Sequence, residues 1–329
     1  MQRGTAIALV VGVAAVAAAV VYAGAGAVAR AVENLRISGL LLLVILHLPI
    51  VVLMGFAWWQ VAGDDPPASH WRFAWARFVR DAAGEILPFL QLGGLVFGLR
   101  ALGRGGRALT VGAVSASIDG IIELTAKLPY ALAALLTLLA LAPQSPLARL
   151  LAAALAMTGV FVAILLFMRR SLGASLQAMA RAVSARWPGV ISPEDDPGGR
   201  AVQACFESIL SQHRRLWSGF ALHLCCWFLG AAEAWVIFRL LGVDLTLWQA
   251  LAIDGTVMGL RTFGWMVPGA LGIQEGSYLL AAAVFGVPPA AAIAASLARR
   301  ARDLVLGAGI LGIAAVGDAN FSLVRRSQC

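Results

Sequence analysis

Six long, predominantly apolar stretches constrain this chain more than any other feature, because each is long enough to cross a membrane. A helix needs about 20 apolar residues to span a hydrocarbon core of roughly 30 Å. Helices satisfy their own backbone hydrogen bonds in lipid, whereas the alternating pattern of a membrane β-barrel is absent from this sequence. We therefore predict an all-α polytopic membrane protein with about six spanning helices, at residues 5–29, 37–62, 108–141, 147–168, 217–241 and 290–317.

Composition points to the same class of protein. The chain is 60% hydrophobic and 13% charged, whereas soluble domains carry about 25% charged residues. Its formal net charge of +8 suits the basic cytoplasmic loops of a membrane protein. No basic patch is interleaved with aromatic residues in a soluble segment, so we predict no nucleic-acid partner.

Two further apolar segments, residues 81–99 and 247–286, are broken by glycine, proline and charged residues. The first makes a poor spanning helix, and the second is too long for one and has Pro268 near its centre. Non-helical backbone is tolerated at membrane depth where protein buries it or where it lines a wet cavity. Both segments are therefore predicted to be re-entrant helical hairpins.

Arginine placement predicts the orientation of these elements. The loop at about 169–216 is rich in arginine, which favours the cytoplasmic side. Counting outward from that loop, a first hairpin that returns to its own side keeps Arg72, Arg77 and Arg80 inside. The second hairpin then enters from the periplasm, both termini are cytoplasmic, and the two halves of the chain form an inverted pseudo-repeat.

The chain is predicted to be one integral membrane domain, 1–329, with a first half at about 1–168, a cytoplasmic loop at about 169–216 and a second half at about 217–329. The loop is too short to hold the core of an enzyme domain. Neither the histidines nor the cysteines show the spacing of a metal site or a catalytic triad. We expect no catalytic residues, no metal and no cofactor, and we do not expect an enzyme.

Glu85 and Glu275 each place a carboxylate inside one of the two broken segments. A carboxylate at bilayer depth is costly and usually faces an interior cavity on a substrate path. Broken segments in both halves of a chain point to a transporter-like site near the midplane. The alternative is that each glutamate caps a half-helix N-terminus without touching substrate. We expect the pair to line a polar cleft together with Arg80, Gln91 and Gln274.

Asp119, Glu123 and Lys127 share one face of the predicted 108–141 helix, because they lie four residues apart. Charged side chains within a span must face protein or water. Glu123 before Lys127 is the favourable order for an ion pair. This stripe is either a structural ion network or a site that handles substrate or protons.

Arg299, Arg300, Arg302 and Asp303 lie inside the last apolar run. Arginine suits bidentate recognition of phosphate or carboxylate, so these side chains are candidates for holding an anionic lipid headgroup. Asp303 is placed to pair with Arg299 one turn back. The alternative is that the arginines neutralise the buried carboxylates.

These motifs together resemble the lysylphosphatidylglycerol synthase transmembrane-region family over nearly the whole chain. They are, in order, Arg80-x3-Gly84-Glu85-x2-Pro88, Asp119, Pro268-Gly269-x2-Gly272-x-Gln274-Glu275 and Arg299 to Asp303. Within the family, the stretch from Arg80 to Phe89, the following Gln91-Leu92-Gly93-Gly94 and the early Leu46-His47-Leu48-Pro49 are similar to a hopanoid-biosynthesis-associated branch. The resemblance implies a flippase-like inner-membrane protein that moves hopanoid lipids towards the outer membrane.

One position departs from the family pattern. The family motif often carries an arginine beside Gly-Glu, whereas Ala83 precedes Gly84 in this chain. The departure weakens the carry-over of anionic-headgroup recognition. It is consistent with a hydroxylated lipid, because carboxylates accept hydrogen bonds from hydroxyl groups.

We therefore predict transport or flipping of a lipid across or out of the bacterial inner membrane. The expected partner is a membrane lipid, a hopanoid or another polar-headed lipid, and hopanoid-biosynthesis or export proteins are further candidates. The alternative is a non-transporting accessory or scaffold subunit of lipid biosynthesis. The candidate substrate-binding residues are Arg80, Glu85, Gln91, Asp119, Glu123, Gln274, Glu275, Arg299, Arg300 and Arg302.

Overall fold

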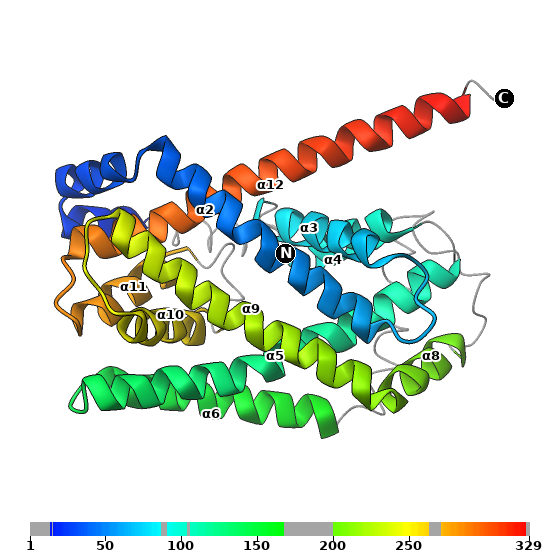
Figure 1. The fold of residues 1–329 in the computed structure, drawn as a ribbon, viewed down its shortest axis with the longest axis horizontal. Helices are drawn as coiled ribbons and strands as arrows, with labels where there is room; N and C mark the ends of the chain where they lie inside the picture. The colour runs from blue at the N-terminus through cyan, green and yellow to red at the C-terminus, as the bar shows by residue number, and fades with distance from the viewer. Residues whose placement is uncertain are drawn as a thin grey trace. The chain divides into compact units, whose positions relative to one another are not determined.

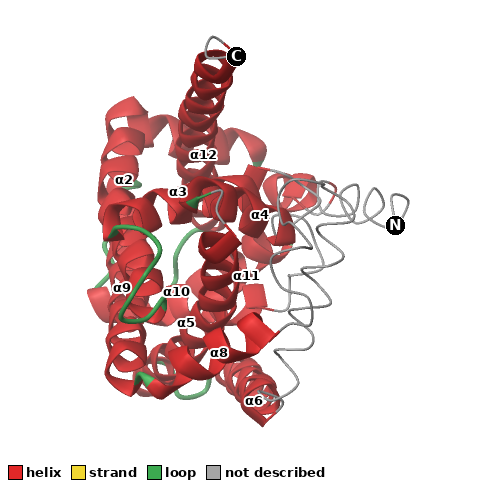
Figure 2. Ribbon diagram, turned by 90° about the vertical axis from the view of Figure 1, so that its right-hand side faces the viewer, coloured by secondary structure: helices red, strands yellow, loops and turns green. Residues whose placement is uncertain are grey.

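The computed structural model describes residues 14, 16–86, 91–103, 106–167, 200–262 and 271–326. Every regular element in this part of the chain is helical, as Figure 2 shows, which agrees with the predicted fold class. The helices are α2 (Ala25–Val61), α3 (His70–Ile86), α4 (Gln91–Leu102), α5 (Gly106–Leu141), α6 (Pro146–Phe167), α8 (Arg200–Ser211), α9 (His213–Leu240), α10 (Leu247–Arg261), α11 (Ile273–Ala283) and α12 (Pro289–Arg326).

Four helical segments in the described residues are long and apolar enough to cross a membrane: Ala25–Val61, Thr110–Leu141, Pro146–Phe167 and His213–Leu240. They coincide with four of the predicted spans. On α6 the apolar side chains of Met157, Phe161 and Ile164 are exposed, as is typical of a surface that faces lipid. The predicted 290–317 span is helical within α12, although α12 is not among the four. In the predicted 5–29 span, residues 5–13 and 15 lie outside the described residues, and the described remainder is helical except at Gly24.

Helix α2 contains a backbone break at Arg36, where φ is 52° and ψ is 165°. The break lies at the end of the largely polar stretch Glu33-Asn34-Leu35-Arg36, directly before the predicted span that begins at residue 37. Arg36 is exposed, so its charge stays out of the apolar core. The start of a new apolar segment at residue 37 therefore corresponds to a real interruption of the helix.

The chain divides into two compact units whose segments alternate along the sequence. The α10–α11 unit contains Met1–Ile50, Ile121–Phe167 and Phe220–Arg302, and the α3–α4 unit contains Val51–Gly120, Met168–Gly219 and Asp303–Cys329. Each unit has its own buried apolar cluster. Each also holds one pair of short neighbouring helices, which can be followed in Figure 1.

The core of the α10–α11 unit includes the fully buried side chains of Leu43, Leu151, Ile237, Ile253 and Tyr278. Helix α10 approaches its neighbours through two glycines one turn apart. A Cβ added at Gly255 would overlap the Cβ of Ala134 in α5, and one added at Gly259 would lie 2.9 Å from Leu151 in α6. Small residues at this spacing let membrane helices pack with their backbones close together.

The core of the α3–α4 unit includes the buried side chains of Trp58, Phe73, Ala76, Leu99, Leu102 and Ala116. Helix α4 packs on α3 through Gly94 and Gly98. A Cβ added at Gly94 would overlap the carbonyl oxygen of Arg80, and one at Gly98 would lie 2.9 Å from the Arg80 Cβ. Helix α3 begins at His70, before the predicted segment 81–99, because Arg72, Arg77 and Arg80 make the first part of the helix too polar to belong to an apolar segment.

Candidate functional site

Three arginines of α12, lying within one turn, form the centre of the buried polar part of the α10–α11 unit. Arg299 and Arg302 are buried, and Arg300 is half-buried. Their partners are Asp254 of α10 for Arg299, Glu275 of α11 for Arg300 and Glu233 of α9 for Arg302. The first half of α12 is therefore tied by ion pairs to three different helices.

Arg299 pairs with Asp254, which is 1% exposed. Its Nη2 lies 2.6 Å from Asp254 Oδ1 and donates to the Gly230 carbonyl oxygen of α9 at 3.0 Å. The other carboxylate oxygen accepts a hydrogen bond from the Tyr130 hydroxyl of α5. The phenol hydroxyl thus satisfies one oxygen of a carboxylate that is withdrawn from water, whereas the other oxygen is ion-paired with the guanidinium without a hydrogen bond from the described residues.

Arg300 binds Glu275 through two nitrogens, with Nε 2.6 Å from Oε1 and Nη2 3.2 Å from Oε2. The completely buried Glu275 also accepts hydrogen bonds from the Ser296 hydroxyl at 3.1 Å and the Gly272 backbone N–H at 2.8 Å. Gln274 donates to the Ser296 carbonyl and hydroxyl oxygens at 3.2 and 2.9 Å. Glu275 therefore caps the start of α11 and also carries a bidentate ion pair.

Arg302 pairs with Glu233, and this carboxylate has a second partner on α2. Arg302 Nη1 donates to Glu233 Oε1, while His47 Nδ1 lies 3.0 Å from Oε2. The Arg302 and Glu233 side chains are almost entirely buried. The His47 ring therefore adds a titratable group to one of the buried ion pairs.

The network is balanced in charge and costly to disturb. Three arginines face three carboxylates, so the sum is neutral when His47 is uncharged. Removing one member of a buried ion pair leaves an uncompensated charge, which costs about 3–5 kcal/mol. Such pairs need not stabilise the fold more than apolar packing would, and charged side chains in the apolar segments of membrane proteins commonly mark functional sites.

The α3–α4 unit has a smaller cluster of charges around Asp119, which is completely buried. Arg77 Nη1 and Arg80 Nη1 lie 3.5 and 3.6 Å from Asp119 Oδ2, and Arg77 Nε donates to Asp81 at 2.7 Å. Glu85, by contrast, is exposed near the end of α3. Glu85 therefore lacks the burial that distinguishes Glu275.

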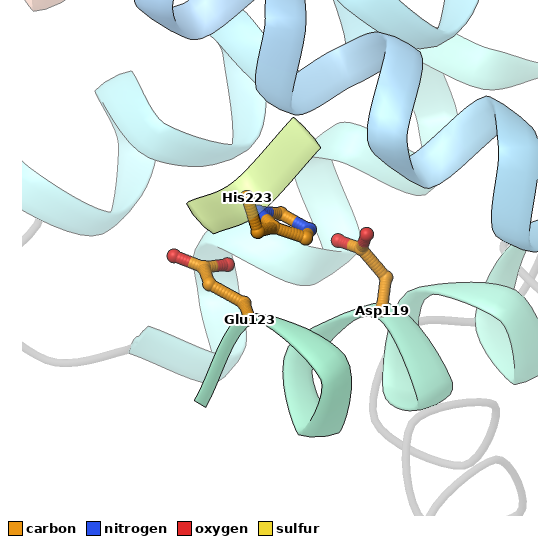
Figure 3. A group of neighbouring side chains, drawn as sticks. All are labelled: Asp119, Glu123 and His223. Atoms are coloured by element: carbon orange, nitrogen blue, oxygen red, sulfur yellow. The ribbon is translucent and has the colours of Figure 1, made fainter. Parts of the chain in front are cut away.

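The predicted stripe on α5 is present, and Figure 3 shows Asp119 and Glu123 projecting from this helix one turn apart. Glu123 and His223 of α9 have ligand atoms within 4.8 Å of each other. Lys127 donates to the Thr262 hydroxyl at 2.8 Å and lies 4.9 Å from the Trp227 ring centroid. Lys127 thus contacts a hydroxyl and an aromatic ring, and the carboxylate of Glu123 one turn before it acts on the ammonium electrostatically.

The structure gathers five of the predicted residues into the network of the α10–α11 unit: Gln274, Glu275, Arg299, Arg300 and Arg302. Arg299 pairs with Asp254, a partner that the expected Arg299–Asp303 pair did not anticipate. The side chain of Gln91 lies outside the described residues.

Sequence reasoning missed five members of the network: His47, Tyr130, Glu233, Asp254 and Ser296. Glu233 and Asp254 carried the signal that singled out Glu275, a charge within an apolar run. Neither has a proline nearby, although Asp254 lies within the broken segment 247–286.

A buried network of ion pairs and four candidate spans define a polytopic membrane protein. The chain belongs to the lysylphosphatidylglycerol synthase TM region family, whose family model matches residues 6–310. Comparison with curated proteins and with solved structures finds no match. Family membership gives the protein a lipid-related function in a membrane, in agreement with the resemblance seen in the sequence.

Proposed function

We propose that this chain moves a lipid, a hopanoid or related terpenoid, across or out of the bacterial inner membrane. The observation that carries the proposal is the set of three ion pairs that joins α12 to α9, α10 and α11. Ionisable side chains at membrane depth are rare and mark substrate or ion pathways. In a family with a lipid-related function, the substrate expected on such a pathway is a lipid.

The state of the arginines favours an uncharged, hydroxylated lipid. Each of Arg299, Arg300 and Arg302 already has a carboxylate partner, so an anionic headgroup would have to displace one. A hydroxylated lipid needs hydrogen bonds alone, and carboxylates, amides and hydroxyls provide them. Hopanoids fit that chemistry, and so we retain the hopanoid branch as the proposed substrate class.

The proposed topology has six spans, two re-entrant hairpins that enter from opposite faces, and both termini in the cytoplasm. Helix lengths support it. Helices α10 and α11 have 15 and 11 residues, and at about 1.5 Å per residue they reach roughly 22 and 16 Å, less than the 30 Å core. Helix α4, with 12 residues, is similarly short. Such helices suit hairpins that enter a membrane and return.

The proposed activity needs neither an enzyme reaction nor a cofactor, and its energy source would be a gradient, a partner protein or none. Proteins of hopanoid synthesis or export are the proposed partners. An accessory role without transport is the competing function. The two are separated by whether the purified chain moves lipid by itself.

The test uses the purified full chain in vesicles that hold a fluorescently labelled triterpenoid alcohol. Loss of fluorescence to a membrane-impermeant quencher reports lipid that reaches the outer leaflet. We expect faster movement than in protein-free vesicles and a loss of roughly tenfold or more in Glu275→Gln, since a hydrogen bond to a charged group contributes about 1.5–3 kcal/mol. The exposed Glu207→Gln of α8 is the matched control. A wild-type rate equal to that of protein-free vesicles would overturn the proposal and leave the accessory role.

A further inference from the structure

His47 introduces a titratable ring into an apolar helix. It lies in the candidate span Ala25–Val61, and its Nδ1 is 3.0 Å from Glu233 Oε2. Its side chain is 21% exposed, whereas that of Glu233 is 2% exposed. Histidine is the side chain whose charge ordinarily changes between pH 5 and 8. The partly exposed His47 ring therefore contacts a carboxylate that is itself buried.

The pairing decides where a proton is taken up. A carboxylate only accepts hydrogen bonds, so the neutral ring donates its Nδ1–H to Glu233. The lone pair on Nε2 is then the position that receives an incoming proton. Uptake from hydronium breaks one O–H bond, forms one N–H bond at Nε2 and leaves a water molecule, and the positive charge passes to the ring. Release to water reverses the step.

Glu233 is shared between two cationic partners once His47 is protonated. Its Oε1 accepts from Arg302 and its Oε2 faces His47. Arg299 of α12 and Tyr278 of α11 also act on this carboxylate electrostatically. These are the charged and titratable groups around the pair in the described part of the unit. An imidazolium and a guanidinium therefore compete for one buried carboxylate.

The competition between His47 and Arg302 for Glu233 affects the α10–α11 helix pair. The network is neutral while His47 is neutral, and a proton adds one charge that no member of the network balances. An uncompensated buried charge is costly, and a weaker Arg302–Glu233 pair is the direct consequence. Arg302 lies on the same turn of α12 as Arg299 and Arg300, which form the ion pairs with Asp254 of α10 and Glu275 of α11.

We propose that His47 and Glu233 form a proton-binding site that couples lipid movement by this chain to the pH difference across the membrane. The coupling rests on the proposed function, whereas the proton site can be tested without it. Asp, Glu and His side chains at membrane depth form proton relays in pumps and transporters. With one proton per lipid, a difference of one pH unit supports about a tenfold ratio of lipid between the leaflets.

The first measurement reads the proton on His47 and needs no lipid movement. The full chain, labelled with ¹⁵N-histidine, is placed in vesicles of phosphatidylethanolamine and phosphatidylglycerol, and the ring signals are followed by solid-state NMR from pH 5 to 8. The chain has four histidines, and the signal that disappears in His47→Gln identifies the ring. We expect this signal to convert between neutral and charged forms. A signal that stays constant over the range would overturn the proposal.

The second measurement tests the coupling. The same vesicles receive the labelled triterpenoid alcohol and a difference of one pH unit. We expect the leaflet ratio to move from one towards about ten with the wild type and to stay near one with His47→Gln. His213→Gln, at an exposed position, should match the wild type. Equal ratios in wild type and His47→Gln would overturn the coupling. A wild type that moves no lipid overturns the proposed function and the coupling with it, while the ring signals still decide the proton site.

Discussion

The two short helix pairs contribute side chains of opposite charge to their buried ion pairs. In the α10–α11 pair the helices contribute the acids, Asp254 and Glu275, and a neighbouring helix contributes the arginines. In the α3–α4 pair, α3 contributes Arg77 and Arg80, and α5 contributes the buried acid Asp119. Both pairs also rely on glycines for close packing.

This difference indicates which helix pair is destabilised more when one charged side chain is removed. In the α10–α11 unit each arginine pairs with a different carboxylate, so a single replacement breaks the ion pair of a buried charge. In the α3–α4 unit Asp119 serves two arginines, and Arg77 also has Asp81. Because partners are shared, we expect the α3–α4 cluster to tolerate the loss of one charged side chain better than the α10–α11 network does.

The largest expected effect comes from Asp254→Ala. The change leaves Arg299 without its carboxylate and Tyr130 without its acceptor, so we expect the free energy of unfolding to fall by about 3–5 kcal/mol. Thermal unfolding of the purified chain in detergent measures it. Asp244→Ala is the control, because its pair with Arg239 is largely exposed and contributes about 0–1 kcal/mol.

A double variant sharpens the same comparison. Asp254→Leu combined with Arg299→Leu removes both charges, and replacing a buried pair by apolar side chains is often neutral. We expect the double variant to recover most of the stability lost in Asp254→Ala. A double variant that is no more stable than Asp254→Ala would show that lost packing, and not the orphaned charge, causes the damage.

Asp119→Asn should have a smaller effect. The amide can still accept a hydrogen bond, and Arg77 keeps Asp81, so we expect a loss of about 1–3 kcal/mol. The same unfolding measurement applies. A loss as large as that of Asp254→Ala would contradict the idea that shared partners protect the α3–α4 cluster.

The sequence was a good guide to the helices and a partial guide to the site. Long apolar runs predict helices because lipid leaves the backbone few alternatives, and the predicted runs match α5, α6, α9 and most of α12. Charges in apolar runs also pointed to Glu275 and the α12 arginines. The choice of partner could not be read from the sequence, because Asp254 and Arg299 meet through folding and are 45 positions apart.

Glycine replacements test whether close packing is common to both pairs. Gly255→Ala adds a Cβ against Ala134, and Gly94→Ala adds one against the backbone of Arg80. We expect each to lower the free energy of unfolding by about 1–2 kcal/mol, as overpacking does. Gly276→Ala meets nothing within 4 Å and serves as the control in α11. A control loss equal to that of Gly255→Ala would mean that glycine flexibility, and not space, sets the effect.

The smallest expected effect on stability separates Glu85 from Glu275. Glu85 is exposed and Glu275 is completely buried, although the sequence presents them as equivalents. We expect Glu85→Gln to change the free energy of unfolding by less than about 0.5 kcal/mol, as exposed replacements do, and yet to slow lipid movement in vesicles. That combination would assign Glu85 to the lipid path without any role in folding. Unaltered lipid movement in Glu85→Gln would confine the site to the α10–α11 unit, where the buried charges are individually paired.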